Sequence, residues 1–388
     1  MVRPARCEQF HAAEIGIVHT VQRCVRRAFL TGIDEKSGKD YSFRREWIRR
    51  RLEALASVFG IDVLTYAIMS NHMHLILRNR PDVVAAWSDK EVAVRWLRVF
   101  PGRRIGEQLA EPSESDVHML IGQPERLAVV RARLSDISWF MRAVSEPIAR
   151  LANRQDDCTG RFWEGRFKAL RLVDETGLLA CAMYVDLNPV RAAMAATPEQ
   201  SLHTSVYDRI QSDNGTLINA AAFDLVPLGT EAAGEKISKT PIDELRPQRD
   251  TNRRSPTGRR IRRDAWLAPL ALAKDVLALE PQVHGDGLRA SDKGFLPLNW
   301  ESYLSLLRWT AHRGNDDAVA QVPPKLAGLL SSLGINAGMW RDMVWHFRKH
   351  FGRGSCVGSP SAMVADAERT GKRWHRGQKA VKAFYLAA

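Results

Sequence analysis

The stretch of sequence that decides the fold reads Tyr66-Ala67-Ile68-Met69-Ser70-Asn71-His72-Met73-His74-Leu75-Ile76-Leu77. Two runs of β-branched, aromatic and aliphatic residues flank a polar pair at positions 70 and 71, which is typical of two strands joined by a tight turn. In the second run, strand alternation sends His72 and His74 to one face and the apolar residues to the other. We therefore predict a β-hairpin that presents two imidazoles on one face of a sheet.

Two histidines at this spacing can supply two nitrogen ligands to one metal ion. The spacing alone is weak support, because 11 histidines in 388 residues produce a His-x-His pair by chance about 0.3 times per chain. A pair of surface histidines on an exposed strand is the alternative interpretation.

The sequence around this hairpin predicts an alternation of strands and helices. Strand patterns occupy residues 15–29, 61–69, 72–77 and 160–172, and helical patterns occupy residues 43–59, 135–153 and 174–187. A further helix is expected after Ser88, which forms a Ser-x-x-Glu capping box with Glu91. This order predicts an α+β domain with an antiparallel sheet and helices on one face.

The last of these helices carries a candidate nucleophile. Asp174 can cap it, and the Asn188-Pro189 pair should end it, because the residue before a proline avoids the helical region. Tyr184 falls four residues before Asn188, so both project from one stripe of the helix. A tyrosine there can present a phenolate for attack on phosphorus. An ordinary tyrosine at a surface boundary is the alternative.

Composition favours an anionic partner. The net charge is +13 and the pI is about 9.8, which indicates nucleic acid. No apolar run approaches the roughly 18 residues that a membrane span requires, so we expect a cytoplasmic protein with no membrane partner. The five cysteines are scattered and form no Cys-x-x-Cys pair, which argues against a disulfide framework or a structural zinc site built from them.

A second motif interleaves aromatic and basic side chains between residues 160 and 168. Aromatic rings stack on unpaired bases, and arginines hold phosphates. Strand alternation also requires that at least one of Phe162 and Trp163 fills the core. The side chains expected to contact DNA are Arg161, Arg166, Phe167 and Lys168.

Three segments of the chain, in this order, resemble the signature segments of the REP-associated tyrosine transposases (RAYT), single-tyrosine enzymes of the HUH superfamily of single-strand nucleases. The first is the hairpin quoted above. The other two are Gly160-Arg161-Phe162-Trp163-Glu164-Gly165-Arg166-Phe167 and Tyr184-Val185-Asp186-Leu187-Asn188-Pro189-Val190-Arg191-Ala192. The resemblance covers roughly residues 10–210.

This resemblance implies a ferredoxin-like sheet whose histidines face the helix that carries the nucleophile Tyr184. It implies a divalent ion, Mg²⁺ or Mn²⁺, held by His72, His74 and a third polar side chain, which by position is Asn188. The implied activity is that of a transposase and endonuclease that cleaves and rejoins single-stranded or hairpin DNA through a 5′-phosphotyrosine. Whether such an enzyme works as a monomer or a homodimer stays open.

The chain departs from compact members of that family. Because 109 residues separate His74 from Tyr184, we expect an insertion at residues 81–125. Residues 229–265 are interpreted as a basic linker, and residues 266–388 as a mostly helical, basic C-terminal region that adds nonspecific DNA affinity. The alternatives to the enzyme are a non-cleaving DNA-binding regulator on the same fold and an RNA-binding module.

Overall fold

The structure is a computed structural model that describes residues 13–25, 30–33, 38–101, 112–219, 260–272, 287–312, 321–352 and 354–386. Most of the expected basic linker lies outside the described residues. Within the described part of the chain, no helix has the length and apolar character needed to cross a membrane.

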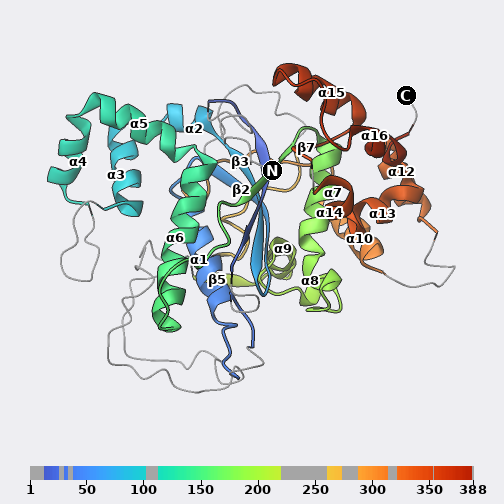
Figure 1. The fold of residues 1–388 in the computed structure, drawn as a ribbon, viewed down its shortest axis with the longest axis horizontal. Helices are drawn as coiled ribbons and strands as arrows, with labels where there is room; N and C mark the ends of the chain where they lie inside the picture. The colour runs from blue at the N-terminus through green and yellow to red at the C-terminus, as the bar shows by residue number, and fades with distance from the viewer. Residues whose placement is uncertain are drawn as a thin grey trace.

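A five-stranded sheet forms the centre of the molecule (Figure 1). Its strand order is β2-β3-β1-β4-β7, and every neighbouring pair is antiparallel except β4 and β7. The strands are β1 (Ile17–Arg23), β2 (Ile61–Ile68), β3 (His72–Asn79), β4 (Lys168–Leu172) and β7 (Cys356–Val357). The predicted hairpin and the predicted α+β class are confirmed by this arrangement.

Helices form at the expected residues 43–59, 135–153 and 174–187, with ends that differ by up to three residues, and a further helix follows Ser88. Ser88 caps α3 with both hydrogen bonds of the capping box, and Asp174 caps α7. The helices are α1 (Arg44–Ala56), α2 (Pro81–Ala85), α3 (Asp89–Val99), α4 (Glu114–Ile121), α5 (Pro124–Leu134), α6 (Ile137–Gln155), α7 (Glu175–Asp186), α8 (Asn188–Arg191) and α9 (Ser205–Asp213).

The elements that follow α9 are mostly short. A two-stranded sheet pairs β5 (Leu217–Asn219) with β6 (Arg260–Arg262). The helices that follow are α10 (Trp300–Ala311), α12 (Pro324–Ser332), α13 (Trp340–Trp345), α14 (Phe347–Phe351), α15 (Pro360–Arg369) and α16 (Gln378–Val381). The last of these helices are separated at short intervals, and His346 lies between α13 and α14.

Helices cover both faces of the sheet, which corrects the prediction of helices on one face. Helices α1 and α6 share a core with Met73 and Leu75, whereas α7 and α9 share a second core with Ile76 (Figure 1). Strands β2 and β3 are buried along nearly their whole length. A strand that is apolar on both faces needs a packed layer on each side.

The expected strand over residues 160–172 forms only in its second half, as β4. Gly160 and Gly165 have φ angles of 93° and 155°, in the region that glycine tolerates and that interrupts a regular strand. Trp163 makes only an isolated bridge to Cys24. Phe162 and Trp163 instead fill the core that α1 and α6 cover.

The C-terminal region packs into the same core as α7. Tyr303, Phe347 and Cys356 belong to the apolar cluster that α7 lines. A side chain at Gly177 would place its Cβ 2.7 Å from the carbonyl oxygen of Val357, so only glycine permits α7 to approach β7 this closely. Residues beyond 300 therefore help to hold the helix that carries Tyr184.

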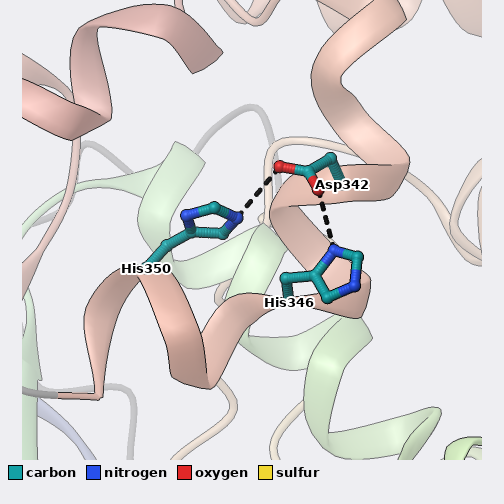
Figure 2. Close-up of side chains that lie close together, drawn as sticks. All are labelled: Asp342, His346 and His350. Carbon is teal, nitrogen blue, oxygen red and sulfur yellow. Dashed lines mark hydrogen bonds and ion pairs between the residues drawn. The ribbon is translucent and has the colours of Figure 1, made fainter.

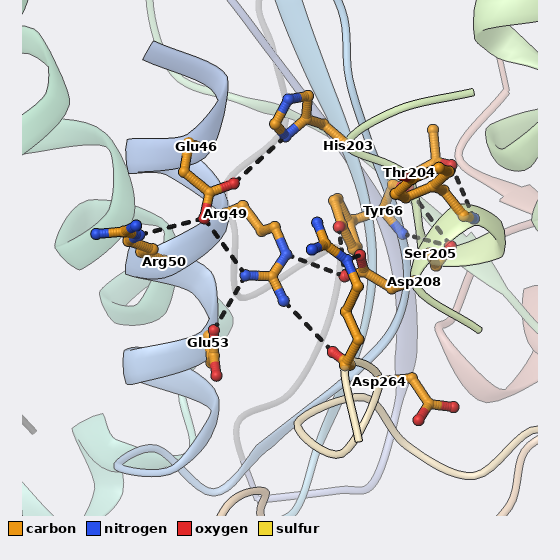
Figure 3. Close-up of polar contacts among 12 residues, drawn as sticks. Glu46, Arg49, Arg50, Glu53, Tyr66, His203, Thr204, Ser205, Asp208 and Asp264 are labelled. Carbon is orange, nitrogen blue, oxygen red and sulfur yellow. Dashed lines mark hydrogen bonds and ion pairs between the residues drawn. The ribbon is translucent and has the colours of Figure 1, made fainter. Parts of the chain in front are cut away.

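A buried ion network joins three elements on the edge of the sheet (Figure 3). Asp208 of α9 is fully buried and accepts hydrogen bonds from Arg49 Nε at 3.2 Å and from Tyr66 Oη at 2.7 Å. Arg49 also pairs with Glu53 at 3.2 Å. Each charge is thus compensated by partners from neighbouring elements.

Arg49→Ala should lower the free energy of unfolding by about 1.5–3 kcal/mol, because it removes one of the two arginines, Arg49 and Arg263, that pair with the buried Asp208. Arg50→Ala is the matched control, since Arg50 also pairs with Glu46 but is 71% exposed, and it should cost less than about 1 kcal/mol. Urea unfolding of both variants measures the difference. Equal, small losses would contradict the assigned role of Asp208.

Candidate functional site

A cleft of about 790 Å³ opens on the α7 side of the sheet. We call it the histidine cleft. Strands β1, β3 and β4, helix α7 and helix α14 contribute its walls. The side chains that line it and that bear on chemistry are His19, Arg23, His72, His74, Arg166, Lys168, Tyr184, Phe347, Arg348 and Lys349.

Three imidazoles meet in this cleft. His72 and His74 lie on the same face of β3 with ring centroids 4.8 Å apart. His19 comes from the adjacent strand β1, and its ring stacks on His74 with a 2.9 Å hydrogen bond between His19 Nε2 and His74 Nδ1. His74 is thus the hydrogen-bond partner of the buried His19.

All three imidazoles are held in the neutral form. Burial lowers the pKa of His19 to about 3 and that of His72 to about 4, and it lowers the pKa of His74 well below its ordinary value. The cations Arg23 and Arg348 lower the pKa of His72 further. A neutral imidazole keeps one nitrogen lone pair, which is the form that binds a metal ion.

The hydrogen bonds fix which nitrogens remain for a ligand. Asn71 Oδ1 lies 2.5 Å from His72 Nδ1; an amide oxygen only accepts, so His72 Nδ1 donates and its lone pair is on Nε2. His74 Nε2 is buried and has no hydrogen-bond partner. A metal-binding histidine commonly has its other nitrogen oriented by a second polar group, as His74 Nδ1 is by His19. These two residues fit a divalent ion.

Tyr184 projects from α7 toward the same imidazoles. Its ring centroid lies 5.6 Å from that of His74 and 4.8 Å from that of Phe347, on which it stacks. The side chain is only 5% exposed. Burial raises the pKa of the Tyr184 hydroxyl, and the nearby guanidinium of Arg191 opposes that rise.

Asn188 does not line the cleft. Arg191 contacts both Asn188 and Tyr184. α7 ends before Leu187, and Asn188 is the first residue of the separate short helix α8. Arg191 Nη1 donates to Asn188 Oδ1 at 3.4 Å, and the Arg191 guanidinium lies 4.7 Å from the Tyr184 ring centroid. Asn188 Nδ2 is buried without a hydrogen-bond partner.

The expected DNA contacts divide into two groups. Arg166 and Lys168 are exposed and line the cleft, whereas Arg161 is exposed but does not line it. Phe167 is 9% exposed and packs in the core with Phe162. The structure corrects the prediction for Phe167, whose ring is not presented for stacking on bases.

The sequence motifs did not identify several residues of the site. Phe347, Arg348 and Lys349 reach the cleft from a helix far along the chain, and only the folded chain brings them to β3. Arg191 lies inside the third motif, three residues after Asn188. That i, i+3 spacing on a helix could have indicated their contact.

The chain has little detectable similarity to known proteins. A scan against models of protein families and a search of curated proteins both find no match. Among solved structures, the chain is similar to a REP-associated tyrosine transposase bound to a REP hairpin, with a TM-score of 0.30 and 12% identity over 57% of this chain and 92% of that one. This is a weak and distant likeness in fold, and nothing about activity is inferred from it.

Arg191→Gln should raise the pKa of Tyr184 further, because a neighbouring cation favours the phenolate and its loss favours the neutral phenol. Ultraviolet absorbance titration, with Tyr184→Phe as the reference that identifies the signal, measures this pKa. Arg341→Gln is the control, since Arg341 lies over the Trp309 ring in a similar way and should leave the Tyr184 titration unchanged. An unchanged titration in Arg191→Gln would contradict the assigned contact.

Proposed function

We propose that this protein is a metal-dependent endonuclease and strand transferase, a transposase, that cleaves and rejoins single-stranded DNA, in particular at hairpins. The observation that carries the proposal is that a tyrosine and the two histidines of a His-x-His pair, from elements far apart in sequence, line one basic cleft. The three ordered motifs that resemble the REP-associated tyrosine transposases support the same activity.

The proposed catalytic core is ferredoxin-like. Neighbouring strands in the order β2-β3-β1-β4 are antiparallel, and α1 and α6 lie on the same face. A helix joins β1 to β2, a tight turn joins β2 to β3, and helices lead from β3 to β4, which is the split βαβ arrangement. This arrangement directs the histidines of β3 toward α7.

The basic side chains of the cleft would hold the DNA backbone. Arg23, Arg166, Lys168, Arg348 and Lys349 line it, against a single acidic residue, Glu164. Such a surface attracts phosphates and releases condensed counterions when they bind.

His72 and His74 would hold Mg²⁺ or Mn²⁺, with Asn188 as the third ligand that the motif implies. When bound, such an ion polarises the phosphodiester and stabilises the charge that develops on its oxygens. No carboxylate or cysteine in the described residues forms a three-ligand set with the two histidines. Asn188 Oδ1 would have to exchange its contact with Arg191 for the ion.

Tyr184 would supply the nucleophile. Its hydroxyl oxygen forms a bond to the 5′ phosphate while the bond from phosphorus to the 3′ oxygen breaks, and the proton of the hydroxyl passes to the departing 3′ oxygen through solvent. Arg191 favours the phenolate, and His19 orients His74. The resulting phosphotyrosine conserves the bond energy, so the free 3′ hydroxyl can reverse the reaction without a nucleotide cofactor.

The second candidate function is DNA or RNA binding without cleavage. It is favoured by the burial of Tyr184, whose ring is stacked on Phe347 and 5% exposed. Attack on DNA requires that this hydroxyl reaches the phosphate. A regulator would need only the basic rim of the cleft.

Tyr184→Phe should abolish a covalent protein–DNA adduct that survives denaturation when the protein is incubated with labelled hairpin DNA and Mn²⁺. Tyr207→Phe is the matched control, because Tyr207 also has an arginine over its ring, yet it lies outside the cleft and should leave adduct formation intact. Gel analysis of the labelled products measures both. No adduct with the unaltered protein across varied hairpins would favour the binding function.

Arg166→Ala and Lys168→Ala should each weaken binding to single-stranded DNA and reduce the slope of log K against log salt by about 0.7, the amount expected for one phosphate contact. The exposed Arg142 of α6 lies on the opposite side of the sheet, so Arg142→Ala should leave the slope unchanged. Fluorescence anisotropy at several salt concentrations measures these slopes. Equal slopes in all three variants would place the DNA elsewhere.

A further inference from the structure

A second group of side chains of the kinds that can bind a metal lies on helices α13 and α14 (Figure 2). Asp342 belongs to α13, His346 stands at the joint between α13 and α14, and His350 belongs to α14. His346 Nδ1 lies 2.8 Å from Asp342 Oδ1, and His350 Nε2 lies 2.9 Å from Asp342 Oδ2. The carboxylate of Asp342 thus contacts one nitrogen of each imidazole.

The helical path across the joint keeps these three side chains on one side. The backbone N–H of His346 donates to Asp342, and that of His350 donates to His346, each four residues back. The spacing is Asp-x-x-x-His-x-x-x-His, and residues four apart are neighbours on a helix surface. Two histidines at this spacing are the pair that binds zinc in helical metal sites.

The joint itself has a physical cause. The carbonyl oxygen of Trp345 accepts a 2.6 Å hydrogen bond from Arg191 Nη2, whereas the N–H of Lys349 donates to His346, three residues back. A side chain that takes a carbonyl out of the helical ladder bends a helix at that point. The bend ends α13 and begins α14 at His346.

Packing orients one of the ligands in advance. The His350 ring packs edge-on against Phe384 at 4.8 Å, and the side chain is 18% exposed. Its Nε2 makes no well-aligned hydrogen bond although it is buried. Asp342 and His346 are more exposed, at 41% and 57%, so an ion can enter from solvent.

We propose that Asp342, His346 and His350 bind a divalent transition-metal ion of the zinc class. Two imidazole nitrogens and one carboxylate oxygen are a donor set that zinc prefers, with water in the fourth position. The three ligand atoms lie within 4.8 Å of one another. The exposed imidazole of His346 would gain little from a surface ion pair with Asp342 alone, whereas an ion shared by all three side chains offsets the cost of ordering it.

The bound ion would hold α13 to α14 at the joint that supports the histidine cleft. Trp345 and Phe347 flank His346, and they contact Arg191 and Tyr184 respectively. Fixing the joint therefore fixes the ring on which Tyr184 stacks. The proposed metal site does not depend on the DNA chemistry proposed for the histidine cleft.

The test uses the full chain with His72→Ala and His74→Ala, which removes the other expected metal site, after treatment with a chelator. Zn²⁺ alone is titrated into this protein by calorimetry. The same titration follows with Asp342→Asn or His350→Gln added, and with His118→Ala as the control, because His118 is an exposed histidine on the distant helix α4.

One equivalent of Zn²⁺ should bind to the starting protein and to the His118→Ala control. Affinity should fall at least about tenfold in Asp342→Asn and in His350→Gln, as expected when a metal site loses a partner. Co²⁺ should give the visible absorption of a tetrahedral site only where all three side chains remain. Equal Zn²⁺ affinity in every variant, or no Zn²⁺ binding by the starting protein, would overturn the proposal.

Thermal unfolding keeps the test decisive if a variant is poorly folded. Zn²⁺ should raise the Tm of the starting protein and of the His118→Ala control and leave that of His346→Ala unchanged. His346 is 57% exposed, so its replacement should not disturb the fold. A rise in Tm of the same size in His346→Ala would place the ion elsewhere.

Discussion

Burial of the β2–β3 hairpin on both faces is the constraint on which the rest of the structure depends. Both strands are buried at nearly every position, so each face of the sheet needs its own layer of helices. The first layer comes from α1 and α6, and the second from α7 with the C-terminal helices. The polar side chains on the second face are thereby enclosed, and each needs a partner or a ligand.

This enclosure sets the chemistry of the histidine cleft. Burial holds the imidazoles of β3 neutral, and the contact between His19 and His74 leaves the lone pair of one nitrogen for a ligand in the corresponding tautomer. The same burial raises the pKa of Tyr184, while Arg191 opposes that effect. Desolvation and the Arg191 cation therefore shift the pKa of Tyr184 in opposite directions, and their balance decides how readily the phenolate forms.

Buried polar networks attach the C-terminal region to this core. Asp186 accepts hydrogen bonds from Ser205 at 2.5 Å and from Tyr303 at 2.6 Å, and burial raises its pKa to about 6. It thus joins α7 to α9 and to α10. Such groups are costly to bury unless every partner is in place, so they specify how the later helices dock behind Tyr184. That docking also sets the position of the joint between α13 and α14.

Local pattern determined much of the fold: strand alternation placed His72 and His74 on one face, and the capping residues Ser88 and Asp174 marked where helices begin. Both signals depend only on neighbours in sequence, which is why they could be read from it. Tertiary structure alone decided the second helical layer, the burial of Phe167 and the contact of Phe347 with Tyr184. Residues 163 positions apart meet only when the chain packs, since their contact depends on which apolar surfaces exclude water together and not on any local spacing.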